Sequence, residues 1–165
     1  MWLFLNGKVL PQEEVFISAF DRGFQFADGV YEVIRYYPQR FFELDAHLKR
    51  LEYSLNEIHI PVPEIQNIEK TLTELIGINE LTYEPSIAYI QITRGNQYPR
   101  RHSISNVSPP TFLISVEKFL PKTDEMVNGI KAGLEKDLRW LRCDIKSTSL
   151  LPNVLSGYNA EGKGF

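Results

Sequence analysis

The sequence predicts an α+β fold with hairpin-paired strands and two helices. Three observations support this prediction. A hairpin signal lies near the amino terminus, two middle segments carry apolar residues at three- and four-residue steps, and two later segments alternate apolar and polar residues. We expect a small α+β domain over residues 1–118, a linker over 119–123, and the incomplete beginning of a second domain over 124–165, because the residues after the linker are too few to bury a core.

The first element expected is a tight hairpin. Asn6-Gly7 is a dipeptide that favours the two-residue turns of hairpins, so short strands are expected over residues 2–5 and 8–10. Asp21-Arg22-Gly23 indicates a further turn before the next strand.

A second hairpin is expected after that turn. Residues 30–37 are rich in valine, isoleucine and tyrosine, which favour strands. Pro38-Gln39 would turn the chain, so that residues 40–43 pair back on the strand.

Two amphipathic helices follow. The first is expected to begin at an Asp45 N-cap and to end before Pro61 and Pro63. Its apolar stripe consists of Leu48, Leu51, Leu55 and Ile58. The second is expected over Glu64–Ile76, with Gly77 as its stop. Its inward residues are expected to be Ile65, Ile68, Leu72, Leu75 and Ile76.

Strands are expected again over residues 86–94 and 111–117, which alternate apolar and polar positions. Residues 95–110 form a long loop between them, and a loop of this length inside a compact domain is often functional. Beyond the linker, a strand is expected over 129–134 and a short helix from about Ser147.

Composition limits the function classes. The hydrophobic content of 43% and the charged content of 24% are typical of a soluble globular protein. A net charge of −3 argues against a nucleic-acid binder, which needs a basic field. The sole cysteine, Cys143, forms no internal disulfide, and no window has the run of about 18 apolar residues that a membrane span needs. We expect a cytoplasmic protein that binds neither nucleic acid nor membranes.

Lys146 is the first candidate for chemistry. It lies in a run with two arginines, Arg139 and Arg142, and with Asp144. Neighbouring cations lower the pKa of a lysine and make its amine nucleophilic enough to form a Schiff base. The alternative is an ordinary solvated lysine on a charged segment.

Arg100 and His102 are the second candidate. At alternating spacing they would face the same side of an extended segment and could clasp one anion. The alternatives are plain surface charge or, with Tyr98, a small single-stranded nucleic-acid patch.

Other polar residues have structural explanations first. Arg50 borders the apolar stripe of the first helix, where it could extend into solvent or pair with a phosphate. Tyr31 and Glu32 lie in a predicted strand, and packing is their default explanation. His47 and His59 have no metal-ligand partners at convincing spacing, so no metal site is expected.

Four segments together carry a family resemblance. Residues 21–33 read DRGFQFADGVYEV, residues 45–51 read DAHLKRL, residues 139–147 read RWLRCDIKS and residues 150–155 read LLPNVL. In this order and spacing they resemble the signature segments of class IV (fold-type IV) PLP-dependent aminotransferases. The resemblance covers essentially the whole chain.

The resemblance implies a fold and a cofactor. The fold is the small amino-terminal domain of this family, an antiparallel sheet with two helices, followed by the start of the large PLP-binding domain. The cofactor is pyridoxal 5'-phosphate, held by a Schiff base on Lys146 and by Arg50 at its phosphate. Lys146 would also be the catalytic base.

Within the family, the likeness is strongest to D-amino acid aminotransferases. It implies that Tyr31, Arg100 and His102 hold the substrate carboxylate, with the arginine and histidine reaching across from the partner subunit of a homodimer. The implied substrates are D-amino acids such as D-alanine and 2-oxo acids. Three residues rather than two separate Gly95 from Pro99, which departs from the pattern.

The family normally runs to about twice this length, so the chain is expected to be a truncated form. Three alternatives stay open at this point. Two belong to the same family, aminodeoxychorismate lyase and branched-chain aminotransferase. The third is a non-catalytic dimerisation module made of residues 1–118.

Overall fold

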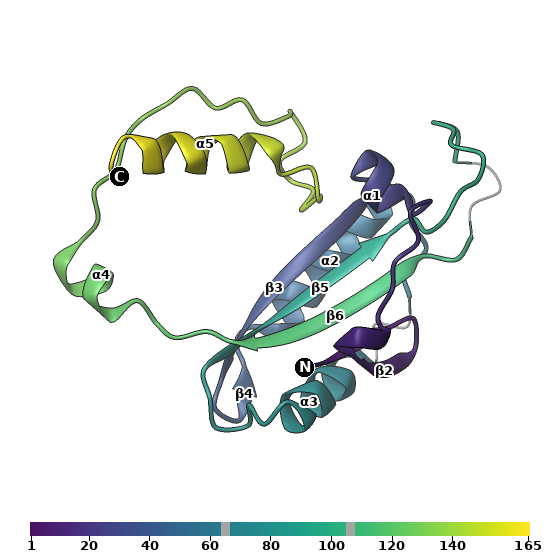
Figure 1. The fold of residues 1–165 in the computed structure, drawn as a ribbon, viewed down its shortest axis with the longest axis horizontal. Coiled ribbons are helices and arrows are strands. Elements are labelled where there is room, and N and C mark those ends of the chain that lie inside the picture. Colours follow the sequence, from purple (N-terminus) through teal and green to yellow (C-terminus); the bar gives the residue numbers. More distant parts are fainter. Residues whose placement is uncertain (64–66, 105–107) are drawn as a thin grey trace.

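The computed structural model describes residues 1–63, 67–104 and 108–165. Its centre is a six-stranded antiparallel sheet with the order β2-β1-β6-β5-β3-β4 (Figure 1). The strands are β1 (Trp2–Leu5), β2 (Lys8–Pro11), β3 (Gly29–Tyr37), β4 (Arg40–Phe41), β5 (Ser86–Thr93) and β6 (Thr111–Lys118). The α+β prediction with an antiparallel sheet is confirmed.

Both predicted hairpins are present. Leu5 pairs with Lys8 across the Asn6-Gly7 turn, whose two residues have φ of 49° and 89°. This left-handed pair matches the twist of antiparallel strands. Strand β4 pairs back on the end of β3, as expected, although it is only two residues long.

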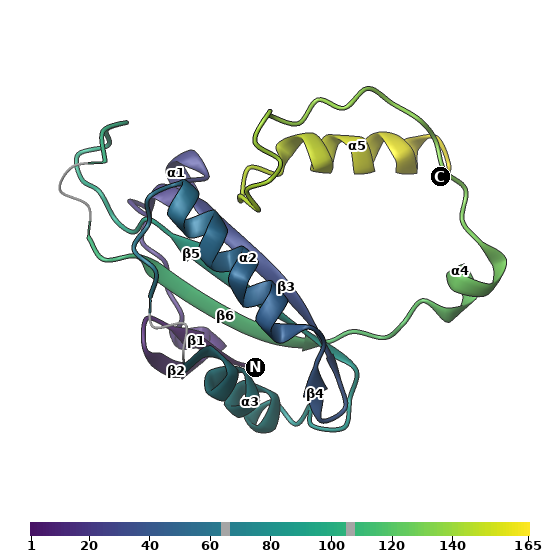
Figure 2. The same ribbon diagram turned by 180° about the vertical axis from the view of Figure 1, so that it is seen from behind.

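Two long helices cover one face of the sheet (Figure 2). They are α2 (Leu44–Glu57) and α3 (Ile68–Ile78). Residues of β3 at even positions point toward these helices and are buried, whereas Tyr31, Val33 and Arg35 between them are only half-buried. The core between helices and sheet includes Ile34, Leu51, Leu55, Leu72, Ile90 and Ile114.

Both helix boundaries differ from the prediction. The N-cap of α2 is Glu43, in the left-handed region, and Asp45 lies in the first turn instead, where its charge still suits the helix dipole. Gly77 lies inside α3, and Asn79 is the C-cap because its side-chain amide donates to the Leu75 carbonyl. The expected helix start at residues 64–66 lies outside the described residues.

The Asp21-Arg22-Gly23 segment is not a turn but the start of a short helix, α1 (Arg22–Phe26). The Asp21 carboxylate accepts from the Gly23 N–H at 2.8 Å, so it caps the helix. The same carboxylate accepts from the hydroxyls of Thr93 and Thr111, which fixes α1 to the ends of β5 and β6.

The chain beyond the sheet forms an arm that leaves β6 and returns to β3 (Figure 1). Its helices are α4 (Thr123–Asn128) and α5 (Leu151–Gly162), and the 3-10 turn η1 (Gln12–Glu14) completes the elements. The strand expected over 129–134 is wrong, because these residues are exposed and, within the described ranges, form no strand. In the described part of the chain, no helix is long and apolar enough to cross a membrane.

Helix α5 begins at Leu151 rather than near Ser147 because the preceding residues bind the sheet. Ser147 forms an antiparallel bridge with Val30, and the Thr148 N–H donates to the Gly29 carbonyl at 3.0 Å. Residues 146–148 therefore extend the sheet beside the start of β3.

Candidate active site

Lys146 lies on the edge of the sheet beside Tyr31. The Tyr31 N–H donates to the Lys146 carbonyl at 3.0 Å, and the Lys146 N–H donates to Ser54 Oγ of α2 at 3.2 Å. The side chain folds over the open face, so that Nζ lies 4.0 Å from the centroid of the Tyr31 ring. Three backbone and side-chain contacts thus fix one half-buried amine.

The residues before Lys146 are fastened to α2. The Tyr53 hydroxyl donates to the Asp144 carboxylate at 2.7 Å, and Arg142 binds both Asp144 and Glu57. Arg142 and Tyr53 hold the pKa of Asp144 below its ordinary value through these hydrogen bonds. The expectation of two guanidiniums acting on Lys146 is not met, because Arg142 is paired in this way.

Arg139, the second of those guanidiniums, lines the same pocket as Lys146 but binds Asp137 at 2.8 Å. Its charge is therefore neutralised locally.

Arg50 is held by a buried carboxylate. Glu32 has an exposed fraction of 0%, and its two oxygens accept from Nε and Nη2 of Arg50 at 2.5 and 2.7 Å. His47 Nδ1 lies 2.9 Å from the same carboxylate. The hydrogen bonds that Arg50 donates to Glu32 raise the pKa of Arg50. Within the described part of the chain, Nη1 of Arg50 has no hydrogen-bond partner, and 49% of the side chain is exposed.

Tyr31 connects the lysine to its surroundings on the open face. The centroid of its ring lies 5.8 Å from that of Tyr89 on the neighbouring strand β5. Tyr89 is two residues before Gln91, which pairs with Tyr31 in the sheet. Burial, and then the charge of Tyr31, raise the pKa of Tyr89. The charge of Tyr31 also acts on Arg50, so the phenol is within electrostatic reach of the guanidinium.

These groups suit pyridoxal phosphate. A half-buried amine can bond to its aldehyde, and a guanidinium with a free N–H can bind its phosphate. No carboxylate among the described residues forms an ion pair with Lys146 Nζ, so the amine is not already committed. Lys146 and Tyr31 line a pocket of about 210 Å³. This volume is below the roughly 300–1,000 Å³ that ligand pockets enclose.

Arg100 and His102 lie apart from this pocket. Both are exposed, and both contact the ring of Phe26 in α1: the guanidinium carbon of Arg100 lies 4.1 Å from the ring centroid, and the imidazole centroid of His102 lies 5.3 Å from it. The two side chains thus share one side of the loop. Neither is among the residues that line the Lys146 pocket of the same chain.

Sequence reasoning missed two roles around the site. Glu32 was expected to be a packing residue, but it is the anchor of Arg50. Its even register beside Val30 and Ile34 was the available signal, because an acid on an inward-facing position needs a cation. Arg22, Asp28 and Arg94 form a second buried cluster that no pattern indicated.

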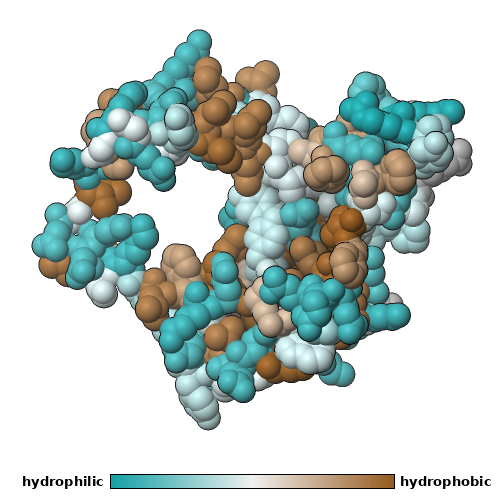
Figure 3. Space-filling model, in the orientation of Figure 1, coloured by the Kyte–Doolittle hydropathy of each residue, from teal (hydrophilic) through white to brown (hydrophobic). Residues whose placement is uncertain are grey.

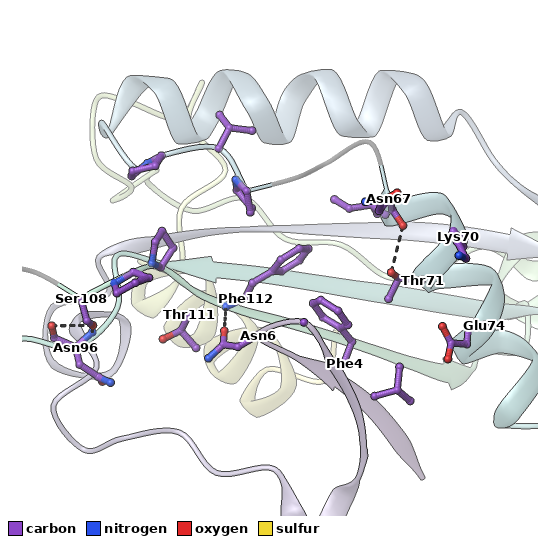
Figure 4. Close-up of a pocket in the computed structure, with 18 residues that line it drawn as sticks. Phe4, Asn6, Asn67, Lys70, Thr71, Glu74, Asn96, Ser108, Thr111 and Phe112 are labelled. Carbon is purple, nitrogen blue, oxygen red and sulfur yellow. Dashed lines mark hydrogen bonds between the residues drawn. The ribbon is translucent and has the colours of Figure 1, made fainter.

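A further cavity, of about 1160 Å³, lies away from Lys146 (Figure 4). It opens between the β1–β2 hairpin and the start of α3. Several of its labelled polar groups bind one another or the nearby backbone, as Ser108 does with Asn96 and Asn6 with the Phe112 N–H. We assign it no chemistry. Among the described residues, no group of three or more His, Cys, Asp or Glu side chains is placed to hold a metal ion.

Comparison with known proteins gives one family. The model for class IV amino-transferases matches residues 29–165. The chain is similar to a D-alanine aminotransferase from Listeria monocytogenes, with 36% identity over 94% of this chain and 54% of the relative. It is 38% identical to that of Bacillus licheniformis, over 98% of this chain and 56% of the relative. The chain spans about half the length of these curated relatives.

Solved structures show the same fold. A hypothetical aminotransferase from Mycobacterium tuberculosis, in a PLP-bound form, superposes with a TM-score of 0.75 and 19% identity, over 99% of this chain and 59% of that one. The branched-chain amino acid aminotransferase of Escherichia coli superposes with a TM-score of 0.62 and 18% identity, over 72% of this chain and 40% of that one.

Proposed function

Because the chain belongs to the class IV aminotransferase family, we propose that it carries the cofactor-attachment half of a D-amino acid aminotransferase site, with Lys146 as the attachment residue. Class IV aminotransferases use pyridoxal phosphate. One observation carries the proposal: a single amine, fixed by β3 and α2, lies 4.0 Å from the Tyr31 ring centroid.

The proposed roles follow from the donors that each residue offers. Lys146 Nζ would hold the cofactor covalently, and Arg50 would bind its phosphate through the N–H groups that Glu32 leaves free. When bound, the cofactor supplies an electron sink for a carbanion at the substrate α-carbon. The Tyr31 ring would keep the lysine amine aimed at that carbon.

In catalysis, Lys146 has a second role. In its free form, the Lys146 amine would accept the α-proton of the amino donor at Nζ and then act as the acid that donates it. Holding the donor in a fixed orientation supplies much of the rate gain, because the translational and rotational entropy is then lost on binding and not in the chemical step.

The substrate carboxylate would be held by Tyr31 together with Arg100 and His102. Since the last two do not line the Lys146 pocket of their own chain, the proposal includes a homodimer in which they serve the partner's site. The amino donor would be a D-amino acid such as D-alanine and the acceptor a 2-oxo acid. The identity of 35–38% to D-alanine aminotransferases supports this substrate class.

A branched-chain aminotransferase is the second candidate, because several such enzymes share the fold. Their identity of 18–20% supports the fold alone. The protein expressed from its full gene should be assayed with D-alanine, with L-leucine and with aminodeoxychorismate. We expect transamination of D-alanine by the complete product, and none after Lys146→Ala. Turnover of L-leucine or release of pyruvate from aminodeoxychorismate in place of it would refute the D-amino acid assignment.

A further inference from the structure

Arg22 is a buried arginine at the start of α1, with an exposed fraction of 4%. Its Nε donates to Asp28 at 2.7 Å, and its Nη1 donates to the Arg101 carbonyl at 2.7 Å and to the Gln97 side chain. Weaker contacts of 3.4 Å reach the carbonyls of residues 102 and 103. The guanidinium therefore binds the backbone of the segment that carries Arg100 and His102.

The charge balance around Arg22 explains why the loop must fold onto it. Asp28 is shared with a second buried arginine, Arg94, which binds it through two hydrogen bonds. Arg94 sends its other donors to the carbonyls of Ile58 and His59. A buried guanidinium needs an acceptor for each N–H, so the remaining donors of Arg22 require the loop carbonyls.

Phe26 completes the arrangement one turn later on α1. Its ring centroid lies 4.8 Å from the guanidinium carbon of Arg22 and 4.1 Å from that of Arg100, and the His102 ring lies tilted against it at 5.3 Å. A cation that lies over the face of an aromatic ring is attracted electrostatically by that ring. The backbone of the loop is thus held by Arg22, and its two anion-binding side chains are held by Phe26.

We propose that Arg22 and Phe26 are positioning residues that set the aim of Arg100 and His102, and so tune the affinity for the substrate carboxylate. The inference rests on the proposed function, because it assumes that this pair binds a carboxylate. Arg22 itself is buried beneath the loop and acts through its carbonyls.

The test uses Arg22→Met, Arg22→Lys and Phe26→Leu, with Arg40→Met as a matched control on exposed β4. Hydrogen exchange of the 165-residue chain, read by mass spectrometry, reports the loop directly. Arg22→Met should speed exchange over residues 97–104 and leave residues 86–93 unchanged. Arg22→Lys should be intermediate, because lysine keeps the charge but not the planar fork. The control should behave as wild type.

The second arm is kinetic and uses the complete gene product. Arg22→Met and Phe26→Leu should raise KM for D-alanine about tenfold with little change in kcat, as expected when uniform substrate binding is lost. Phe26→Leu should do so with loop exchange near that of wild type, because the backbone contacts of Arg22 remain.

Wild-type exchange over residues 97–104 in Arg22→Met, or an unchanged KM in both variants, would overturn the inference. So would faster exchange throughout β3 and β5, which would make Arg22 a general stability residue. If the protein takes up no pyridoxal phosphate at Lys146, the proposed function fails, and the exchange arm then decides the positioning role alone.

Discussion

Arg50 shows how a surface helix presents a cation in a fixed direction. Its Nε and Nη2 bind a fully buried carboxylate from β3, which leaves Nη1 directed away from Glu32. A lysine at this position could contact Glu32, but its single ammonium group could not also extend a second N–H edge toward a phosphate.

Arg50→Lys should therefore weaken binding of pyridoxal phosphate by about 10- to 100-fold, the effect of losing a charge-assisted hydrogen bond worth about 1.5–3 kcal/mol. Titration of the cofactor absorbance measures the affinity. Arg40→Lys, the same change on an exposed strand, should leave it unaltered. Equal affinities of wild type and Arg50→Lys for pyridoxal phosphate would show that Arg50 does not bind the phosphate.

At this scale the sequence was informative where a motif existed. Residue type and family resemblance predict Lys146, Arg50 and Tyr31, and the structure places Lys146 against the Tyr31 ring and Arg50 on Glu32, the next residue of β3. The neighbours that hold them, Glu32 and Ser54, were not identified as such. Their roles depend on which strand and helix pack together, and that contact joins residues far apart in the chain.

At the scale of elements, the loop after β5 depends on its first residue. Gly95 has a φ of +94°, and a Cβ added there would lie 2.2 Å from the Pro109 carbonyl oxygen. Gly7 in the first hairpin has a similar φ of +89° but open space around it. A substitution at Gly7 therefore tests backbone strain alone, whereas a substitution at Gly95 tests backbone strain together with a steric clash.

Gly7→Ala should cost about 1 kcal/mol, the penalty of the left-handed region for a residue with a Cβ. Gly95→Ala should cost clearly more in free energy of unfolding, because the Pro109 backbone must also move. Urea denaturation of both variants measures the difference. Similar midpoints would show that residues 95 and 109 are not in close contact.

The elements that were predicted correctly have local causes. The Asn6-Gly7 hairpin, strand β3 and the apolar stripe of α2 each follow from turn chemistry or periodicity. The elements predicted wrongly depend on distant partners. Residues 129–134 are strand-like in composition, but no strand of the described chain pairs with them. Helix α5 starts late because Ser147 and Thr148 bind β3.

At the scale of the whole molecule, one corner joins several elements. Asp28, which precedes β3, binds Arg22 of α1 and Arg94 at the end of β5, and Arg94 also binds the carbonyls that follow α2. Burial would raise the pKa of Asp28, but the hydrogen bonds and charges of Arg94 and Arg22 outweigh it and hold the pKa below its ordinary value.

Asp28→Asn should destabilise the chain by about 3 kcal/mol at neutral pH, because it leaves two buried guanidiniums without an anion. The depressed pKa means that this stabilisation is fully present above about pH 4 and is lost as pH falls through the lower pKa of the folded state. Denaturation of wild type and variant from pH 7 to pH 2 measures it. The gap between them should close in acid, and a gap independent of pH would contradict the ion-pair explanation.

Exposed apolar side chains lie on the arm and on the face of the sheet that no helix covers. Apolar residues gather where the arm meets the sheet (Figure 3), and Leu141, Leu151 and Leu155 are among the exposed ones. The division into a domain over 1–118 and a second unit over 124–165 stays a prediction. All six strands lie within the first 118 residues, and among the described residues Ile145 is the core residue from beyond them.

The most direct test concerns the attachment of the cofactor. The 165-residue chain should be incubated with pyridoxal phosphate, reduced with borohydride, digested and mapped by mass spectrometry. We predict one stable adduct at Lys146, absent from Lys146→Ala and Lys146→Arg. Label spread over exposed lysines such as Lys8 and Lys49, with Lys146 unmodified, would contradict the account.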